Sequence, residues 1–169
     1  MTSGARQIGS YELLRRIHLS HTAEVFEARP RYGGERVAIK RLLPHALEDP
    51  SIRTRFEREI EMATSHDHPG LVRGLEVIAG PAAEGASGDP CLVMALVEGT
   101  PLIELLDTRA PIEVPTEDAL MHLAHTVATH LLALHEHPDG PMAHGDISGK
   151  NIIARADGDF VLLDLGSMA

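Results

Sequence analysis

Residues 144–151 read His-Gly-Asp-Ile-Ser-Gly-Lys-Asn, and the triplet Asp164-Leu165-Gly166 begins thirteen residues after Asn151. Asp146, Asn151 and Asp164 supply carboxylate and amide oxygens, the groups that Mg²⁺-dependent phosphoryl transfer requires as ligands and proton acceptors. A lone Asp-x-Gly mostly marks a turn, but the whole set at this spacing is much rarer by chance. This stretch therefore indicates phosphate chemistry on a metal ion.

The segment between the two motifs, residues 152–163, consists of two apolar runs separated by Asp157-Gly158. Asp-Gly between two apolar runs is a strong signal for a tight β-hairpin. We therefore expect a hairpin whose two ends bring Asn151 and Asp164 beside one metal ion.

The composition limits the partners. The chain has 169 residues, enough for one domain or two small lobes, and its formal net charge of −10 argues against nucleic acid or an anionic membrane as main partner. No apolar run is long enough to span a bilayer, and the N-terminus lacks the apolar core of a signal peptide. Cys91 is the single cysteine, which excludes an internal disulfide and fits a reducing cytosol. These features predict a cytoplasmic protein.

The first half of the chain predicts an antiparallel sheet with one helix. Residues 1–10 are expected to form a flexible leader, and five strands are expected over residues 11–17, 23–29, 36–42, 71–78 and 91–99. The helix begins at Asp49-Pro50, because proline is well tolerated at the first helical position. Cys91, inside an apolar strand, is interpreted as a small buried hydrophobe.

The helix that starts at Pro50 carries a carboxylate on its apolar face. That face is formed by Ile52, Phe56, Ile60 and Ala63, and Glu59 lies inside it. A buried charge left unpaired costs roughly 3–5 kcal/mol, and Lys40 at the end of the third strand is the obvious partner. The alternatives are a solvated Lys40 at a strand end and a Glu59 that reaches water from the edge of the face.

The second half predicts helices followed by the hairpin, so the fold class is α+β. A short helix ends at Leu106, and a long one follows Thr116 as N-cap. The expected buried face of the long helix consists of Leu120, Leu123, Ala124, Val127, Leu131 and Leu134. The histidine pairs His66/His68 and His122/His125 lack a cysteine or acidic cluster that would complete a zinc site, so solvated histidines are expected.

Taken in order, these motifs resemble the protein kinases of eukaryotic type found among bacterial Ser/Thr kinases. The resemblance rests on Val37-Ala38-Ile39-Lys40, Glu59, the His-Gly-Asp stretch and Asp164-Leu165-Gly166, and it covers residues 11–169. It implies a bilobal fold with an N-lobe over residues 11–94, a hinge over 95–99 and a partial C-lobe over 100–169. The C-lobe would hold two helices, the catalytic loop, the hairpin and the metal triplet.

The resemblance also implies site residues. Asp146 would position an acceptor hydroxyl, Asn151 and Asp164 would hold Mg²⁺, and Lys40, aimed by Glu59, would bind the α- and β-phosphates of ATP. His144 would be structural, packing beneath the metal triplet. The expected ATP-binding residues are Ile17, Val25, Ala38, Lys40, Met94, Ala95, Leu96, Val97 and Ile153, with Met94 guarding the back of the adenine pocket.

Three features of the sequence depart from the family pattern. The glycines that let a kinase loop approach the phosphates correspond to His18, Ser20 and Ala23, so a weaker grip on the β- and γ-phosphates is expected. Gly145 replaces the arginine that usually pairs with a phosphorylated activation loop. Ser148 replaces a phosphate-steadying lysine, whose charge Lys150 would supply.

The sequence stops three residues after Gly166. The resemblance therefore predicts a truncated kinase domain without activation segment or later helices, with weak or absent activity of this chain alone. One alternative is a pseudokinase scaffold that dimerises or docks a protein partner through its incomplete C-lobe. Another is a fragment of a small-molecule phosphotransferase similar to aminoglycoside kinases, which share the His-Gly-Asp form.

Overall fold

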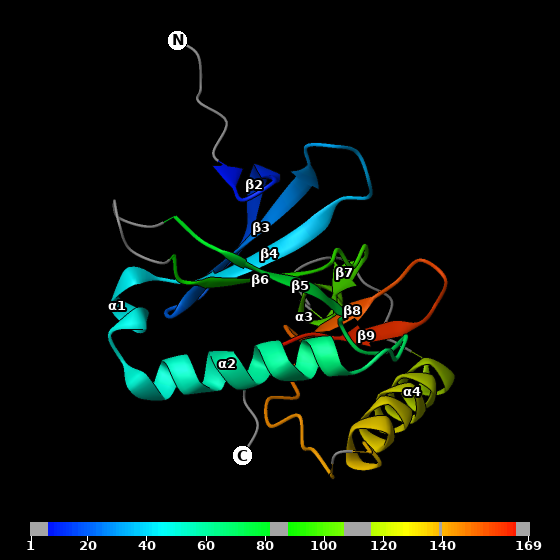
Figure 1. The fold of residues 1–169 in the computed structure, drawn as a ribbon. Coiled ribbons are helices and arrows are strands. Elements are labelled where there is room, and N and C mark those ends of the chain that lie inside the picture. Colours follow the sequence, from blue (N-terminus) through cyan, green and yellow to red (C-terminus); the bar gives the residue numbers. More distant parts are fainter. Residues whose placement is uncertain (1–6, 82–87, 107–115, 139, 165–169) are drawn as a thin grey trace. The chain divides into compact units, whose positions relative to one another are not determined.

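The computed structural model describes residues 7–81, 88–106, 116–138 and 140–164. The chain divides into two compact units (Figure 1). The first consists of Met1–Ser65 and Gly74–Leu96, and the second of His66–Arg73 and Val97–Ala169. Among the described residues, no helix is both long and apolar enough to cross a membrane.

The first unit is built on an antiparallel sheet with the strand order β1-β2-β3-β4-β6-β5. The strands are β1 (Gln7–Ile8), β2 (Tyr11–Leu19), β3 (Ala23–Pro30), β4 (Val37–Leu42), β5 (Gly74–Ala79) and β6 (Pro90–Ala95). The five expected strands are present, and β1 is a sixth that pairs with the start of β2. Ile8 is only 2% exposed and packs in the apolar core, so the sheet already begins inside the leader expected over residues 1–10.

Two apolar clusters lie on opposite faces of this sheet. One joins Ile8, Tyr11, Ala28, Val37, Ile39, Cys91 and Val93. Burial there raises the pKa of the Cys91 thiol to about 11, which keeps it protonated and confirms its interpretation as a buried hydrophobe. The other cluster packs helix α2 (Pro50–Ser65) against the sheet.

Helix α2 forms where the sequence predicts it. The Asp49 carboxylate accepts a hydrogen bond of 2.8 Å from the backbone N–H of Ser51, so it caps the helix, and this bonding lowers the pKa of Asp49. Phe56 and Ala63 are buried against the sheet, while Ile52 and Ile60 are partly buried. The expected apolar face is confirmed. A four-residue helix, α1 (Pro44–Leu47), precedes α2.

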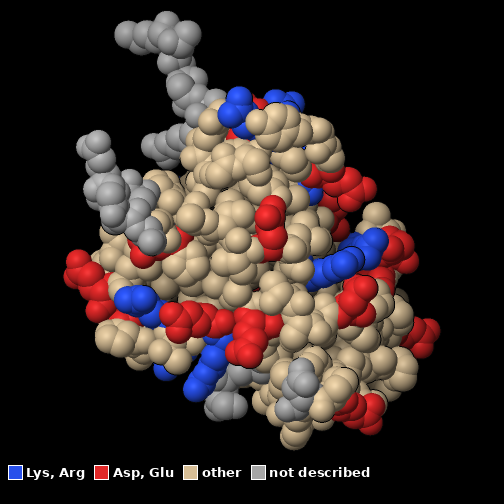
Figure 2. All heavy atoms as spheres, in the orientation of Figure 1, with Lys and Arg blue, Asp and Glu red and all other residues tan. Residues whose placement is uncertain are grey.

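Strand β3 carries two buried carboxylates that the sequence analysis did not single out. Glu27 accepts from Arg15 at 2.8 Å and from Arg36 at 2.6 Å. Glu24 pairs with Arg41 at 2.8 Å and more distantly with Arg16. Because each carboxylate binds guanidinium groups, burial does not leave its charge uncompensated. Figure 2 shows basic and acidic side chains interspersed over the face that it draws.

The described residues of the second unit form a small sheet and two helices. The sheet joins β7 (Thr100–Pro101), β8 (Ile152–Ala154) and β9 (Phe160–Leu162), and the helices are α3 (Leu102–Leu105) and α4 (Glu117–His135). Strands β8 and β9 form the expected hairpin, with Ile153 opposite Val161. Gly158 in its turn has φ of 89°, a left-handed conformation that glycine adopts without strain. The Thr116 hydroxyl caps α4, as expected, by accepting from Ala119 N–H.

The buried face predicted for α4 is only partly confirmed. Leu134 is fully buried and Leu123, Val127 and Leu131 are half-buried, whereas Leu120 is 49% exposed and Ala124 is exposed as well. Thr126, His130 and Leu134 form the buried row instead. The reason is that α4 packs against β9 through polar contacts, in which His130 Nε2 lies 2.9 Å from the carbonyl oxygen of Phe160.

Candidate active site

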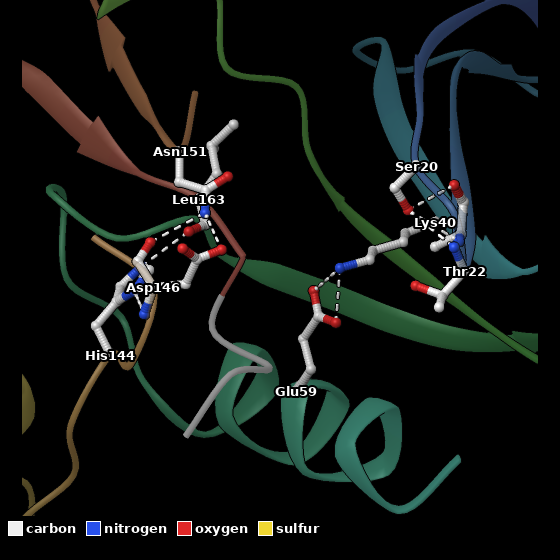
Figure 3. Close-up of polar contacts among 9 residues, drawn as sticks. Ser20, Thr22, Lys40, Glu59, His144, Asp146, Asn151 and Leu163 are labelled. Carbon is white, nitrogen blue, oxygen red and sulfur yellow. Dashed lines mark hydrogen bonds and ion pairs between the residues drawn. The ribbon is translucent and has the colours of Figure 1, made fainter. Parts of the chain in front are cut away.

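Lys40 and Glu59 form a bidentate ion pair within the first unit. Lys40 extends from β4 toward α2, and its Nζ lies 2.6 and 2.7 Å from the two carboxylate oxygens of Glu59 (Figure 3). Both side chains are largely shielded, with exposures of 12% and 8%. Removing two charges from water is costly, so a close pair with both oxygens engaged is the arrangement that makes burial tolerable. The structure therefore brings together the two residues that the helix pattern predicted as partners.

Several of the expected ATP-binding residues share a face of the sheet with Lys40. Val25 on β3 lies opposite Lys40, and Ala38 on β4 lies opposite Met94 on β6. Because cross-strand partners and alternate residues point to the same side, these four side chains lie on one face. Ala38 and Met94 are buried.

The remaining expected nucleotide contacts are distributed over both units. Ile17 lies at an irregularity of β2, between Arg16 and His18, and is 37% exposed. Ala95 ends β6, and Leu96 is the last residue of the first unit. Val97 and Ile153 belong to the second unit, where Ile153 lies on β8. Their assignment as ATP contacts stays a prediction.

Within the second unit, Asp146 and Asn151 are joined by hydrogen bonds. Asn151 Nδ2 donates to Asp146 Oδ2 at 2.9 Å and to the Asp146 backbone carbonyl at 3.0 Å (Figure 3). Asn151 is buried. These two bonds fix the orientation of the amide and bring the carboxylate of Asp146 beside it. The loop of residues 144–151 is thus a preformed polar constellation.

His144 fastens this loop to the end of the hairpin. Its Nδ1 accepts from the backbone N–H of Asp146 at 3.4 Å, so its Nε2 carries the proton and donates to the carbonyl of Leu163 at 2.9 Å. Leu163 N–H in turn donates to the carbonyl of Asn151. Burial lowers the pKa of His144, so the ring stays neutral at pH 7. These contacts are those of a structural histidine.

The donor set fits a magnesium ion. Both hydrogen bonds of Asn151 Nδ2 go to Asp146. The amide oxygen of Asn151, Oδ1, therefore points away from Asp146 and can accept a metal ion. Asp164 follows Leu163 with φ of 58°, an unusual conformation for a non-glycine residue and one found at functional sites. No three His, Cys, Asp or Glu side chains converge as a metal site in the described part of the chain. Mg²⁺ needs only one or two protein oxygens beside phosphates and water.

The structure describes the surroundings of the positions in this loop that depart from the family pattern. Gly145 has φ of 77°, where a residue with a Cβ would be strained. Lys150 Nζ lies 3.7 Å from Asp146 Oδ2, and its role in steadying a phosphate stays a prediction. The Ser148 hydroxyl is buried and has no hydrogen-bond partner among the described residues. Leu165 and Gly166 lie outside the described residues.

The structure also shows a role for Ser20 that sequence reasoning missed. Ser20 was noted only as a replacement for glycine, yet its hydroxyl closes the turn between β2 and β3. Serine hydroxyls can bond backbone groups of the following residues and so stabilise a turn, which is the signal that the sequence offered. His18 pairs with Val25 inside the sheet, and Ala23 is buried at the start of β3.

Comparison with known proteins agrees with this geometry. The family model "Protein kinase domain" matches residues 11–169. The chain is 30% identical to the probable serine/threonine-protein kinase SCO3848 of Streptomyces coelicolor and 31% identical to the serine/threonine-protein kinase AfsK of Streptomyces griseus. These alignments cover 94% and 93% of this chain but only 22% and 18% of the relatives.

A solved structure shows the same fold. The PknI kinase domain of Mycobacterium tuberculosis, solved as a point mutant, superposes with a TM-score of 0.74 at 22% identity. The superposition covers 100% of this chain and 64% of that domain. At this identity the likeness concerns the fold, which is the expected bilobal kinase fold with an antiparallel N-lobe sheet and few helices. With its family model matched from Tyr11 onward, the chain belongs to the protein kinase domain family.

Proposed function

We propose that this chain binds Mg·ATP and carries the phosphoryl-transfer site of a Ser/Thr protein kinase. The observation that carries the proposal is the fixed constellation of Asp146 and Asn151, built on His144 and the hairpin. The Lys40–Glu59 pair supports it independently, because it holds an ammonium group on the sheet face with Val25 and Ala38. The serine/threonine kinases among the relatives suggest a hydroxyl acceptor.

In this proposal each residue has one task. Asp146 has one carboxylate oxygen engaged by Asn151, and the other is directed to an acceptor hydroxyl, whose proton it accepts. Lys150 lies close enough to Asp146 to offset negative charge that gathers there during transfer. Lys40 binds phosphate oxygens, and Asn151 and Asp164 offer oxygens to the metal. Mg²⁺, when bound with ATP, neutralises charge on the phosphates.

The test separates transfer from binding. Asp146→Asn is expected to reduce phosphoryl transfer from labelled ATP to a mixture of Ser/Thr substrates by about 10²-fold or more, because a general base contributes about that much. Calorimetric binding of Mg·ATP should change little, since the amide keeps the size of the carboxylate. Asp118→Asn, an exposed aspartate in the first turn of α4, serves as the charge-matched control. Parent-like transfer by the Asp146→Asn variant would contradict the role of Asp146.

A second candidate function is a nucleotide-binding scaffold without transfer activity. The turn at Ser20 favours this scaffold function, because the Ser20 hydroxyl already bonds a backbone N–H of the turn. The corresponding loop of active kinases needs free backbone N–H groups to hold the ATP phosphates. Nucleotide binding without transfer by the parent chain under the same assay would favour this function. The cytoplasmic location stays a prediction. So do the docking of a protein partner or a second copy on the C-lobe and the alternative that the phosphate acceptor is a small molecule.

A further inference from the structure

The turn between β2 and β3 uses its own hydrogen-bonding groups internally. The Ser20 hydroxyl accepts from the backbone N–H groups of Thr22 at 3.3 Å and Ala23 at 3.0 Å, and it donates to the carbonyl of Ala23 at 3.1 Å. The Ser20 N–H also donates to that carbonyl, at 2.8 Å. A hydroxyl offers one donor and two acceptor sites, so this one is fully used. Figure 3 shows Ser20 and Thr22 facing each other in the turn.

The turn is also tied to the segment before α2. The N–H of Leu43 donates to the carbonyl of Thr22 at 2.8 Å. His45 Nε2 lies 2.8 Å from the carbonyl of His21, and the two imidazole rings lie 5.3 Å apart. Ala23, at the other end of the turn, is buried in the cluster that includes Leu42 and Ala46. These contacts join the turn to the segment that leads into α2.

The place of the turn in the sheet gives these bonds a functional meaning. The turn leads into the β3 residues that lie opposite the end of β4, where Val25 faces Lys40. A phosphate bound near Lys40 would meet the turn, and backbone N–H groups are the donors that a turn offers to phosphate oxygens. Three of those N–H groups, on Ser20, Thr22 and Ala23, are already engaged. This leaves the turn few N–H groups to offer to a terminal phosphate.

We propose that Ser20 is a specificity-determining residue that makes the nucleotide site nearly indifferent to the γ-phosphate. Nucleoside diphosphates and triphosphates then bind with similar affinity, through the base, Lys40 and the metal. This inference rests on the proposed nucleotide function. The cause proposed for the weak γ-phosphate binding is the Ser20 hydroxyl itself and not merely the absence of a glycine. A single substitution removes that hydroxyl.

The test compares ATP, ADP and adenosine by calorimetry at fixed excess Mg²⁺. For the parent chain, the dissociation constants of ATP and ADP are expected to agree within about threefold, since few hydrogen bonds distinguish them. Ser20→Ala frees the N–H groups of Thr22 and Ala23, so its preference for ATP over ADP should rise by roughly tenfold, as expected for charge-assisted hydrogen bonds. Ser20→Thr keeps the hydroxyl and should retain the parent ratio.

Amide exchange provides a second readout that does not depend on ligand. The amides of Thr22 and Ala23 should be protected in the parent and in Ser20→Thr, and exchange faster in Ser20→Ala. Unprotected parent amides, or a parent preference for ATP over ADP of more than about tenfold, would overturn the inference while leaving the proposed function standing. Absence of binding by all three ligands would instead overturn the proposed function.

Discussion

At the scale of single residues, each buried carboxylate in the described part of the chain has a cationic partner. Lys40 and Glu59 are both largely shielded, and two short contacts join them. The sequence could predict this pair because a carboxylate inside an apolar helix face needs a cation, and one lysine stands at a strand end nearby. It could not predict the arginine partners of Glu27, because burial of that residue depends on how the strands curve.

Substitution of Glu59 tests how much the Lys40–Glu59 pair contributes to the free energy of unfolding. Glu59→Ala should lower the free energy of unfolding by about 3–5 kcal/mol, because Lys40 loses its carboxylate partner in a largely buried place. Urea denaturation followed by circular dichroism measures it. The double variant Lys40→Met/Glu59→Leu is the matched control and should lie within about 2 kcal/mol of the parent, since apolar groups of similar size replace both charges. A loss below about 1 kcal/mol for Glu59→Ala would show that water solvates Lys40 well enough.

At the scale of elements, α4 shows how tertiary contacts override a hydrophobic pattern. Its apolar residues predicted one face, but the helix buries the row that holds Thr126, His130 and Leu134. His130 reaches the carbonyl of Phe160 on β9 and lies edge-on to His68, with ring centroids 5.2 Å apart. Burial and the neighbouring His130 lower the pKa of His68, which is therefore uncharged at pH 7. Gly70 is what leaves room for the His130 ring.

This packing predicts that Gly70 tolerates no side chain. A Cβ on Gly70 would lie 2.1 Å from atoms of the His130 ring, so Gly70→Ala should cost about 1–3 kcal/mol of stability through overpacking. The double variant Gly70→Ala/His130→Ala removes the clash. It should therefore be less destabilised than the sum of the two single variants, measured in a double-mutant cycle by urea denaturation. Additive effects would mean that the ring moves aside at no cost.

At the scale of the whole molecule, the candidate residues fall into two sets, one in each unit. The first carries the Lys40–Glu59 pair on its six-stranded sheet, and the second carries Asp146, Asn151 and Asp164 around its hairpin. Each set is fixed by contacts within its own unit. A ligand that binds the folded chain through these groups must stabilise the fold by mass action.

Thermal unfolding with and without Mg·ATP measures this stabilisation. Ligand at about a hundred times its dissociation constant stabilises by roughly 2.7 kcal/mol, which raises Tm by about 5–10 °C for a chain of this size. Asp164→Asn should lose the part of the shift that depends on Mg²⁺, because the amide is a weaker ligand than the carboxylate. ATP with excess chelator on the parent chain is the control. An equal Mg²⁺-dependent shift in the variant would remove Asp164 from the proposed metal site.

The sequence by itself determined the family, the five main strands and helix α2 of the first unit, the hairpin at Asp157-Gly158 and the pairing of Lys40 with Glu59. These follow from local signals: turn residues, helix caps, and a charge that must be paired. Only the tertiary structure decided which face α4 buries and how the turn at Ser20 is closed. Both depend on contacts with residues distant in sequence or on the direction of a single hydroxyl, and neither leaves a periodic pattern in the chain.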